Sequence, residues 1–341
     1  MRKKIKVLIL SLSILAVSSI SITFGILISI NSPSTRYGSG MVYDDSVDKL
    51  ILFGGGFQDS SSYTYYGDTW MYDPIPNLWS EIFPQHHPTA RSSSSMVYDP
   101  VNQKIVLFGG VDITDTWMDD TWIFDSRSQE WTQVFPNSHP SARGSASIFY
   151  DPQAQKVILY GGFRYGGGHF SDTWAFDYST NNWTNLNPPM KPTGRYGAPM
   201  VYDPVNQRGF MFGGRISGIT DETWVYYYPN NSWVELIMLT KPPDRYWEPL
   251  TYDDTAQRII LFGGSDGSGN GLDDTWTYNP FTNQWTQELS SSPPVNRLFS
   301  SFVNIPGTGK SILFGGSSDA NTCLGDTWSY IYSSNNWNKL K

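Results

Sequence analysis

Short apolar runs recur along the chain, and each of them ends in two glycines. The runs occupy residues 50–53, 105–108, 157–160, 210–212, 259–262 and 312–314. A run of three or four apolar residues bounded by glycine is typical of a strand that is buried on both faces. Glycine at the strand end permits tight backbone geometry. The pattern therefore predicts six buried strands in six similar structural units.

Polar and aromatic positions repeat in register with these runs. An acidic residue followed by Thr-Trp comes after each glycine pair, and a second Trp follows nine residues later. An arginine opens each unit: Arg36, Arg91, Arg143, Arg195, Arg245 and Arg297, at intervals of 55, 52, 52, 50 and 52 residues. The acidic residue is Asp in five units and Glu222 in the fourth. A fixed period of this length marks a repeat array that folds as one unit.

Each unit has room for four strands joined by turns. In the second unit, the pattern predicts strands over residues 94–99, 104–108, 121–125 and 130–134, with Asp-Pro and Asn-rich turns between strands. A residue present in every unit cannot mark a single asymmetric site. We therefore expect the repeated Trp to pack between units and the opening Arg to pair with the acidic residue. Anion binding by these arginines is the alternative.

These motifs resemble the kelch repeat, and the resemblance covers residues 36–341. It implies an all-β, six-bladed β-propeller, with one four-stranded antiparallel sheet per repeat set around a central channel. The six blades are residues 36–90, 91–142, 143–194, 195–244, 245–296 and 297–341. Because the first and last units each contain all four strands, we expect every blade to be continuous in sequence. The contact between the first and last blades would then depend on side-chain packing alone.

The N-terminal residues 1–30 differ from the repeats. Four basic residues within the first six precede an uncharged, mainly apolar stretch over residues 7–30. About 20 apolar residues span a bilayer as a helix, and a basic flank stays in the cytoplasm. We expect a transmembrane anchor or a cleaved signal peptide, a linker over residues 31–35, and a body at the cell surface or secreted. A core helix of the body is the remaining alternative.

Composition and charge narrow the class of partner. The chain has 14 Trp, 21 Tyr and 18 Phe, so disorder is not expected. Outside the basic N-terminus, 19 basic residues face 31 acidic ones, a formal charge of -12. Such a body repels phosphate backbones, which argues against nucleic acid. Cys323 is the only cysteine, so no disulfide forms within the chain, and we expect a monomer.

The candidate ligand-binding residues break the repeat, apart from Arg245, which is the opening arginine of the fifth unit. They follow the opening arginine or lie in the variable loop between the second and third strands of a blade, near the expected channel mouth. The candidates are Tyr37, Tyr65, Trp117, Arg164, Tyr196, Arg215, Arg245, Tyr246, Trp247, Glu248 and Phe299. Exposed aromatic side chains on loops suit contact with a protein or a sugar. Aromatics that fold back onto the rim are the alternative.

One loop has the oxygen spacing that begins a calcium loop. Asp266, Ser268 and Asn270 alternate with glycines, and Asp274 follows. The twelfth position, where calcium loops carry a bidentate Glu, is Thr277. A flexible Gly/Ser hairpin therefore explains the loop as well, and we expect no cofactor other than calcium at this place.

The sequence favours binding over catalysis. It contains no HExxH zinc motif and no Gly-x-Ser-x-Gly elbow. We expect a binding module outside the cytoplasm that presents its loops and channel mouth to a protein or glycan. The alternative is a sugar-active enzyme similar to the kelch sialic-acid epimerases, with Arg245 and Glu248 as polar groups near the mouth.

Overall fold

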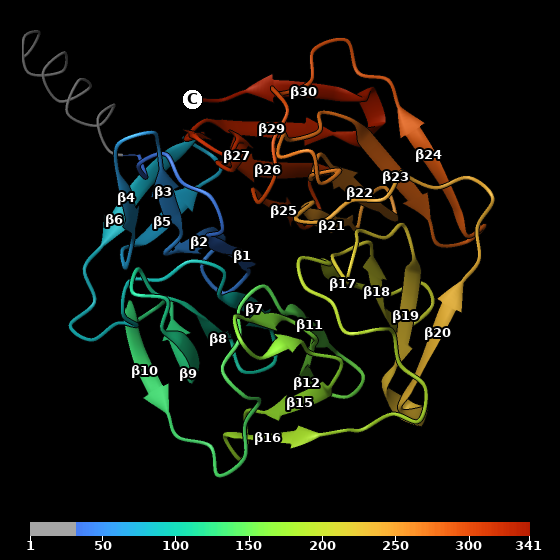
Figure 1. The fold of residues 1–341 in the computed structure, drawn as a ribbon. Coiled ribbons are helices and arrows are strands. Elements are labelled where there is room, and N and C mark those ends of the chain that lie inside the picture. The colour runs from blue at the N-terminus through green and yellow to red at the C-terminus, as the bar shows by residue number, and fades with distance from the viewer. Residues whose placement is uncertain (1–31) are drawn as a thin grey trace, which may run out of the picture.

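The computed structural model describes residues 32–341 as six four-stranded antiparallel sheets around a common axis. Figure 1 shows the sheets arranged as blades of a disc. The predicted all-β, six-bladed propeller is therefore confirmed. The predicted N-terminal helix lies outside the described residues.

The innermost strands face the channel. They are β1 (Gly40–Asp44), β7 (Ser95–Asp99), β11 (Ser147–Asp151), β17 (Met200–Asp203), β21 (Leu250–Asp253) and β25 (Ser301–Ile305). The second strands are β2 (Lys49–Phe53), β8 (Lys104–Val111), β12 (Lys156–Tyr160), β18 (Arg208–Phe212), β22 (Arg258–Phe262) and β26 (Lys310–Phe314). These second strands contain the apolar runs that precede the glycine pairs.

The outer half of each blade contains the two repeated tryptophans. The third strands are β5 (Thr69–Asp73), β9 (Trp117–Asp125), β15 (Thr173–Asp177), β19 (Thr223–Tyr227), β23 (Thr275–Asn279) and β29 (Thr327–Ile331). The fourth, outermost strands are β6 (Leu78–Ile82), β10 (Glu130–Val134), β16 (Asn182–Asn185), β20 (Ser232–Leu236), β24 (Gln284–Glu288) and β30 (Asn336–Lys339). Short 3₁₀ turns at Tyr228–Asn230 and Tyr332–Ser334 precede the last strands of two blades.

The loop between the second and third strands is built differently from blade to blade. Three blades carry an extra two-stranded hairpin there: β3 (Gly56–Gln58) with β4 (Tyr63–Tyr65), β13 (Phe163–Arg164) with β14 (Gly168–His169), and β27 (Ser317–Asp319) with β28 (Thr322–Cys323). In the second blade, β8 and β9 instead lengthen past the glycine pair, so that Val111 pairs with Trp117. None of the helices among residues 32–341 is long and apolar enough to cross a membrane.

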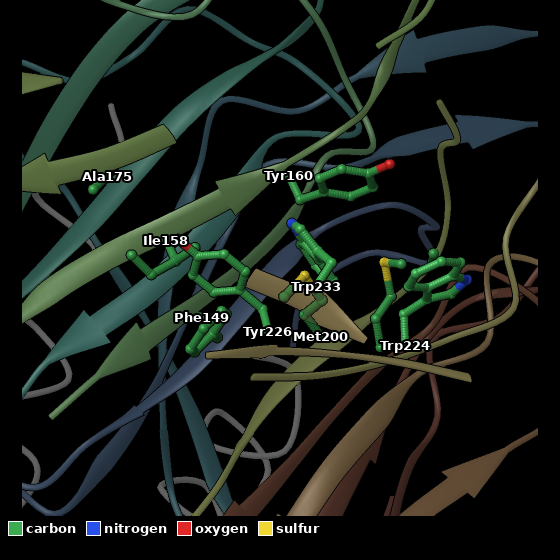
Figure 2. Close-up of a cluster of buried hydrophobic side chains, with 10 residues drawn as sticks. Phe149, Ile158, Tyr160, Ala175, Met200, Trp224, Tyr226 and Trp233 are labelled. Atoms are coloured by element: carbon green, nitrogen blue, oxygen red, sulfur yellow. The ribbon is translucent and has the colours of Figure 1, made fainter. Parts of the chain in front are cut away.

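The core lies between neighbouring blades. The second strands are buried on both faces, and Leu50 to Phe53 of β2 have no exposed surface. Figure 2 shows the cluster between the third and fourth blades, where Tyr160 of β12 lies beside Trp233 of β20. The ring centroids of this pair are 4.7 Å apart. Equivalent pairs join every blade to the next, so the repeated second Trp packs between blades as expected.

The opening arginine of each blade is a buried strut, as predicted. The Arg91 guanidinium donates to both carboxylate oxygens of Asp120, at 2.6 and 2.8 Å, and to the carbonyl of Gly109. The indole of Trp122 donates to the same carboxylate at 2.7 Å. Every blade has its own version of this pair, with Glu222 as the acid in the fourth. The arginines therefore hold the glycine turn to the third strand, and none is free to bind an anion in the channel.

A second hydrogen bond crosses between blades. The indole of the second Trp donates to the hydroxyl of the Asp-Thr-Trp threonine in the preceding blade, as from Trp131 to Thr69 at 3.0 Å. Five of the six interfaces make this bond. At the interface between the fourth and fifth blades, Trp285 and Thr223 both lack a partner. Thr223 follows Glu222, the one acid that is not Asp, so the exception in sequence coincides with the exception in bonding.

Each blade is continuous in sequence, as predicted, including the first and the last. The expectation that their contact depends on side-chain packing alone is wrong. The amide of Arg36 donates to the carbonyl of Leu324 at 2.9 Å, and its carbonyl accepts from the amide of Gly316 at 2.8 Å. The same two backbone bonds form at every other interface, so closure repeats the ordinary contact between neighbours.

Candidate functional site

A closed ring of backbone hydrogen bonds surrounds the channel at the second residue after each opening arginine. The amide of each ring residue donates to the carbonyl of the ring residue in the preceding blade, at 2.7–3.1 Å. The ring residues are Gly38, Ser93, Ser145, Gly197, Trp247 and Phe299, and all have a φ between 50° and 63°. Left-handed φ is unfavourable for bulky residues. Trp247 and Phe299 therefore occupy a strained position where other blades carry Gly or Ser.

Four of the ring residues, Ser93, Ser145, Trp247 and Phe299, line a cavity of about 300 Å³ at the channel mouth, which we call the vestibule. This volume lies at the low end of small-molecule sites. Its walls are mainly aromatic and come from all six blades. The lining residues are Tyr37, Tyr65, Ser93, Val111, Asp115, Trp117, Gly144, Ser145, Phe163, Tyr196, Trp247 and Phe299. A narrower cavity of about 140 Å³, lined by Ser94, Ala146, Glu248 and Ser300 among others, lies along the channel beneath it.

The aromatic rings of the vestibule contact one another from blade to blade. Trp247 and Phe299 stack with centroids 4.7 Å apart and planes 9° apart. The Phe299 ring also contacts the Tyr37 ring, with centroids 5.9 Å apart, and the Trp247 ring contacts the Tyr196 ring, with centroids 6.0 Å apart. These aromatic contacts fix the walls, because offset and edge-to-face pairs have preferred geometries.

The aromatic contacts extend to residues of the second and third blades. Tyr196 contacts Phe163 at 5.1 Å, and Phe163 meets Trp117 edge-on at 5.6 Å. Among residues 32–341, no ring contact joins Tyr65 to Trp117 or to Tyr37, so the circle of aromatic contacts is open at Tyr65. Asp115 also lines the vestibule. Rings that rest on one another across blades form a preorganised wall rather than separate mobile loops.

The aromatic side chains of the vestibule walls are uncharged near neutral pH. Burial and the neighbouring Tyr63 raise the pKa of the Tyr37 phenol, and burial raises the pKa of the Tyr65 and Tyr196 phenols. His169 stacks on Tyr196 with centroids 5.4 Å apart. Partial burial and the charge of Arg215 lower the pKa of His169, so its imidazole is neutral at pH 7.

Glu248 is a buried carboxyl group without a partner. Its equivalents in other blades are Ser39, Ser94, Ala146, Ala198 and Ser300. The side chain is enclosed, and both of its carboxyl oxygens lack a hydrogen-bond partner among the described residues. Burial raises the pKa of Glu248 well above its usual value, so the neutral form is favoured. A buried polar group of this kind in a native structure calls for a functional or energetic explanation.

Most of the predicted site residues come together. Tyr37, Tyr65, Trp117, Tyr196, Trp247 and Phe299 line the vestibule itself, and Glu248 lines the channel below. Tyr246 lies behind the wall with its ring 4.4 Å from that of Trp247, and Arg215 lies over Tyr246 and donates to its hydroxyl at 3.2 Å. Arg164 is exposed on the β13–β14 hairpin.

Arg245 lies outside this site. Its guanidinium donates to Asp274 at 2.6 and 2.8 Å and to the carbonyls of Gly263 and Pro243. It therefore belongs to the blade strut rather than to the mouth. The pair of Arg245 and Glu248 does not form a convergent polar site, because the arginine is fully engaged and the carboxyl group is enclosed.

The same strut holds one of the four predicted calcium ligands, Asp274, away from the other three. Both oxygens of Asp274 accept from Arg245, and one also accepts from Trp276, so Asp274 is not oriented toward the loop. Asp266 accepts from the amide of Ser268, which closes a short exposed turn. Among residues 32–341, no three His, Cys, Asp or Glu side chains are grouped as metal ligands. Calcium at Asp266, Ser268 and Asn270 stays a prediction.

Phe163 is a site residue that the sequence reasoning missed. It follows a glycine pair, and the equivalent residues in the other blades are Gly56, Val111, Arg215, Ser265 and Ser317. The variation of this position among blades, beside an invariant glycine pair, could have identified Phe163 as a site residue. Its place at the mouth follows from backbone pairing, because the residue after the glycine pair forms a β-bridge with the residue after the opening arginine, as Phe163 does with Gly144.

The fold and the repeated struts define a kelch-type propeller. The family model for the KLHDC2/KLHL20/DRC7 Kelch-repeats domain matches residues 21–214 and 203–341, and the chain belongs to this kelch-repeat family. Kelch propellers of this kind are typically protein-interaction modules.

Several curated proteins are similar over part of their length. An F-box/kelch-repeat protein of Arabidopsis thaliana is 28% identical over 184 residues, covering 49% of this chain and 37% of that protein. The tRNA wybutosine-synthesizing protein 4 of Saccharomyces cerevisiae is 25% identical over 42% of this chain and 20% of its own length. Mei4-dependent protein 6 of Schizosaccharomyces pombe is 24% identical over 53% of this chain and 28% of its own. The matched region thus spans little more than a third of these relatives at most.

Proposed function

We propose that this chain is a binding module outside the cytoplasm that holds a protein or glycan partner at the vestibule and its surrounding loops. The observation that carries the proposal is the continuous set of aromatic contacts from the first to the sixth blade. At the ring position, Trp247 and Phe299 replace the Gly or Ser that the other blades carry. Large, rigid aromatic groups supply contact area at low entropic cost.

The location outside the cytoplasm rests on the sequence of residues 1–30. A basic start followed by an uncharged apolar stretch favours export of the body that follows. Cell fractionation and sequencing of the mature N-terminus test this part. Recovery of the full chain only from the cytosolic fraction would contradict it.

A sugar-active enzyme is the second candidate function. It requires titratable groups that converge on a ligand. Arg245 is engaged by Asp274, and the carboxyl oxygens of Glu248 are enclosed. This arrangement favours binding, and turnover of a panel of free sugars by the purified chain would favour the enzyme.

The chain supplies matched variants for a test of binding. Trp247→Gly and Phe299→Ser introduce residues that other blades carry at the ring position with the same left-handed φ, so the fold is expected to survive. Phe135→Ser removes an aromatic side chain that is 81% exposed and lies after β10, away from the channel. A pull-down and glycan-array screen should lose its ligand with the first two variants and keep it with the third. Equal capture by all three would place binding elsewhere.

A further inference from the structure

Among residues 32–341, no Lys, Arg or His side chain lines the cavities on the mouth side, whereas aspartates line three of them. Asp115 lines the vestibule. Asp319 lines a neighbouring cavity of about 260 Å³, which shares Tyr37, Trp247 and Phe299 with the vestibule. Asp59 and Asp115 line a third. Hydrogen bonds from Ser61 and Ser62 lower the pKa of Asp59, and a bond from Asn321 lowers that of Asp319, so both are ionised at neutral pH.

The opening arginines are already engaged, because each is paired with the acid of its own blade. Arg164 is exposed on the β13–β14 hairpin and does not line the vestibule. Arg215 is exposed, but its guanidinium lies over the Tyr246 ring at 5.3 Å. Arg36 over Tyr66 and Arg143 over Phe170 repeat this arrangement at 4.1 and 3.9 Å. Arginines of the chain thus already lie over three aromatic rings, of which Tyr246 lines a cavity on the mouth side.

We propose that the vestibule binds an organic cation, a quaternary or methylated ammonium group, between its aromatic walls and the aspartates of the mouth, Asp59, Asp115 and Asp319. The inference deepens the proposed function, because it names the ligand class for the same site. Aromatic faces attract such cations, and the attraction strengthens when water is excluded. The acidic body attracts the same ligand over a longer range.

An anion fits the vestibule less well, and a neutral sugar gains nothing from the charge of Asp115. The indole N–H groups of Trp117 and Trp247 are enclosed and out of reach. A sugar would therefore depend on Ser93, Ser145, Asp115 and the hydroxyls of Tyr37, Tyr65 and Tyr196. An anion would face Asp115 without a free cation among the lining residues. A methylated ammonium group needs neither hydrogen bonds nor a counter-cation.

Choline and its neutral isostere 3,3-dimethylbutan-1-ol separate charge from shape. In a ligand-observed NMR titration of the purified full-length chain, choline should bind roughly tenfold more tightly than the isostere. Peptides with trimethyllysine or unmodified lysine form a second arm, which distinguishes a small-molecule source from a protein source. A methyl glycoside serves as the neutral sugar. Equal binding of choline and the isostere, or binding of the glycoside without choline, would overturn the proposal.

Variants assign the binding to the vestibule. Trp247→Gly and Asp115→Asn should each weaken choline binding at least about fivefold, the first by removing a ring and the second by removing charge. Asp115 has a φ of 60°, which Asn accepts readily, so the backbone should be preserved. Phe135→Ser should leave binding unchanged. If choline binds equally well to every variant, or to none including the wild type, the inference is wrong. Partner capture that Trp247→Gly still abolishes would then leave the proposed function standing.

Discussion

Single residues distinguish the site from the scaffold. At the ring position, a left-handed backbone is required in every blade, and Gly38 or Gly197 adopts it without strain. Trp247 and Phe299 adopt it at a cost of about 1–3 kcal/mol each. Next to Trp247, the chain also encloses an unpaired carboxyl group, Glu248. Two strained backbone positions and one unpaired buried carboxyl group therefore lie together at this mouth, at positions where other blades carry Gly, Ser or Ala. Such a concentration of unfavourable features is typical of a functional site.

Glu248→Ala should raise the free energy of unfolding at pH 7 by on the order of 1 kcal/mol or more, because it removes a buried polar group without a partner. Ala146 and Ala198 show that the position accepts alanine. The folded-state pKa of Glu248 is raised, so the wild type loses stability as pH rises above the unfolded pKa near 4.5. The gain should therefore shrink toward pH 4.

Urea unfolding at several pH values measures this effect. Glu235→Ala, at an exposed carboxylate on β20, is the matched control and should shift stability by less than about 0.5 kcal/mol. A Glu248→Ala gain that is independent of pH would show that the carboxyl group does not titrate differently in the folded state.

At the scale of elements, each blade depends on one strut and one interlocking tryptophan. The strut joins the opening arginine to the acid before the third strand, and the tryptophan joins the fourth strand to the preceding blade. Burial alone would raise the pKa of Asp172, but its hydrogen bonds with Arg143 and the charge of Arg143 hold that pKa below its usual range. The arginine guanidinium has no exposed surface, so the pair depends on both partners.

Asp172→Asn should lower the free energy of unfolding by about 3–5 kcal/mol, because it leaves the buried Arg143 charge unpaired. The folded-state pKa of Asp172 is depressed, so its contribution is present above the unfolded pKa and is lost as pH falls below about 3.8. The difference from wild type should therefore be full at pH 7 and reduced at pH 3. Chemical denaturation at both pH values measures it, and Glu235→Gln provides an exposed control. A loss below 1 kcal/mol at pH 7 would mean that the strut contributes little.

The repeat allowed strands and struts to be predicted from sequence, because each position was seen six times. It did not predict features that occur once. The extension of β8 and β9 and the three extra hairpins lie in loops that share no pattern. The aromatic contacts between Trp117, Phe163 and Tyr196 join residues from three blades, and a linear pattern carries no information on which loop tips meet.

At the scale of the whole molecule, the propeller closes between its first and last blades by the same backbone hydrogen bonds that join any two neighbouring blades. The hydrogen-bonded ring at the channel mouth passes from Phe299 to Gly38 without interruption. The innermost strands likewise contact one another around the full circle, including β1 with β25. The sequence could not predict this, because backbone bonds between blades leave no residue signature except the tolerance of left-handed φ.

The position of the chain ends should therefore matter little for stability. A circular permutant with new ends in the linker after β6, near Gln85, and a flexible connection from Lys341 to Ser32 should fold to the same propeller. Circular dichroism and thermal unfolding should give a midpoint within a few degrees of the unpermuted 32–341 body. Opening the chain inside β12, which is buried throughout its apolar run, should instead abolish folding. If both permutants fail, closure at the native junction has a special role.

Hydrogen–deuterium exchange of the full chain, free and with its captured partner, tests the location of the binding site most directly. Binding at the vestibule predicts slower exchange in residues 111–117, 163–169, 196–197, 246–248 and 298–300, which surround the channel mouth. The outer strands β10, β20 and β24 should exchange as they do in the free protein. Protection confined to those outer strands, or to the opposite end of the channel, with the mouth unchanged, would contradict the account.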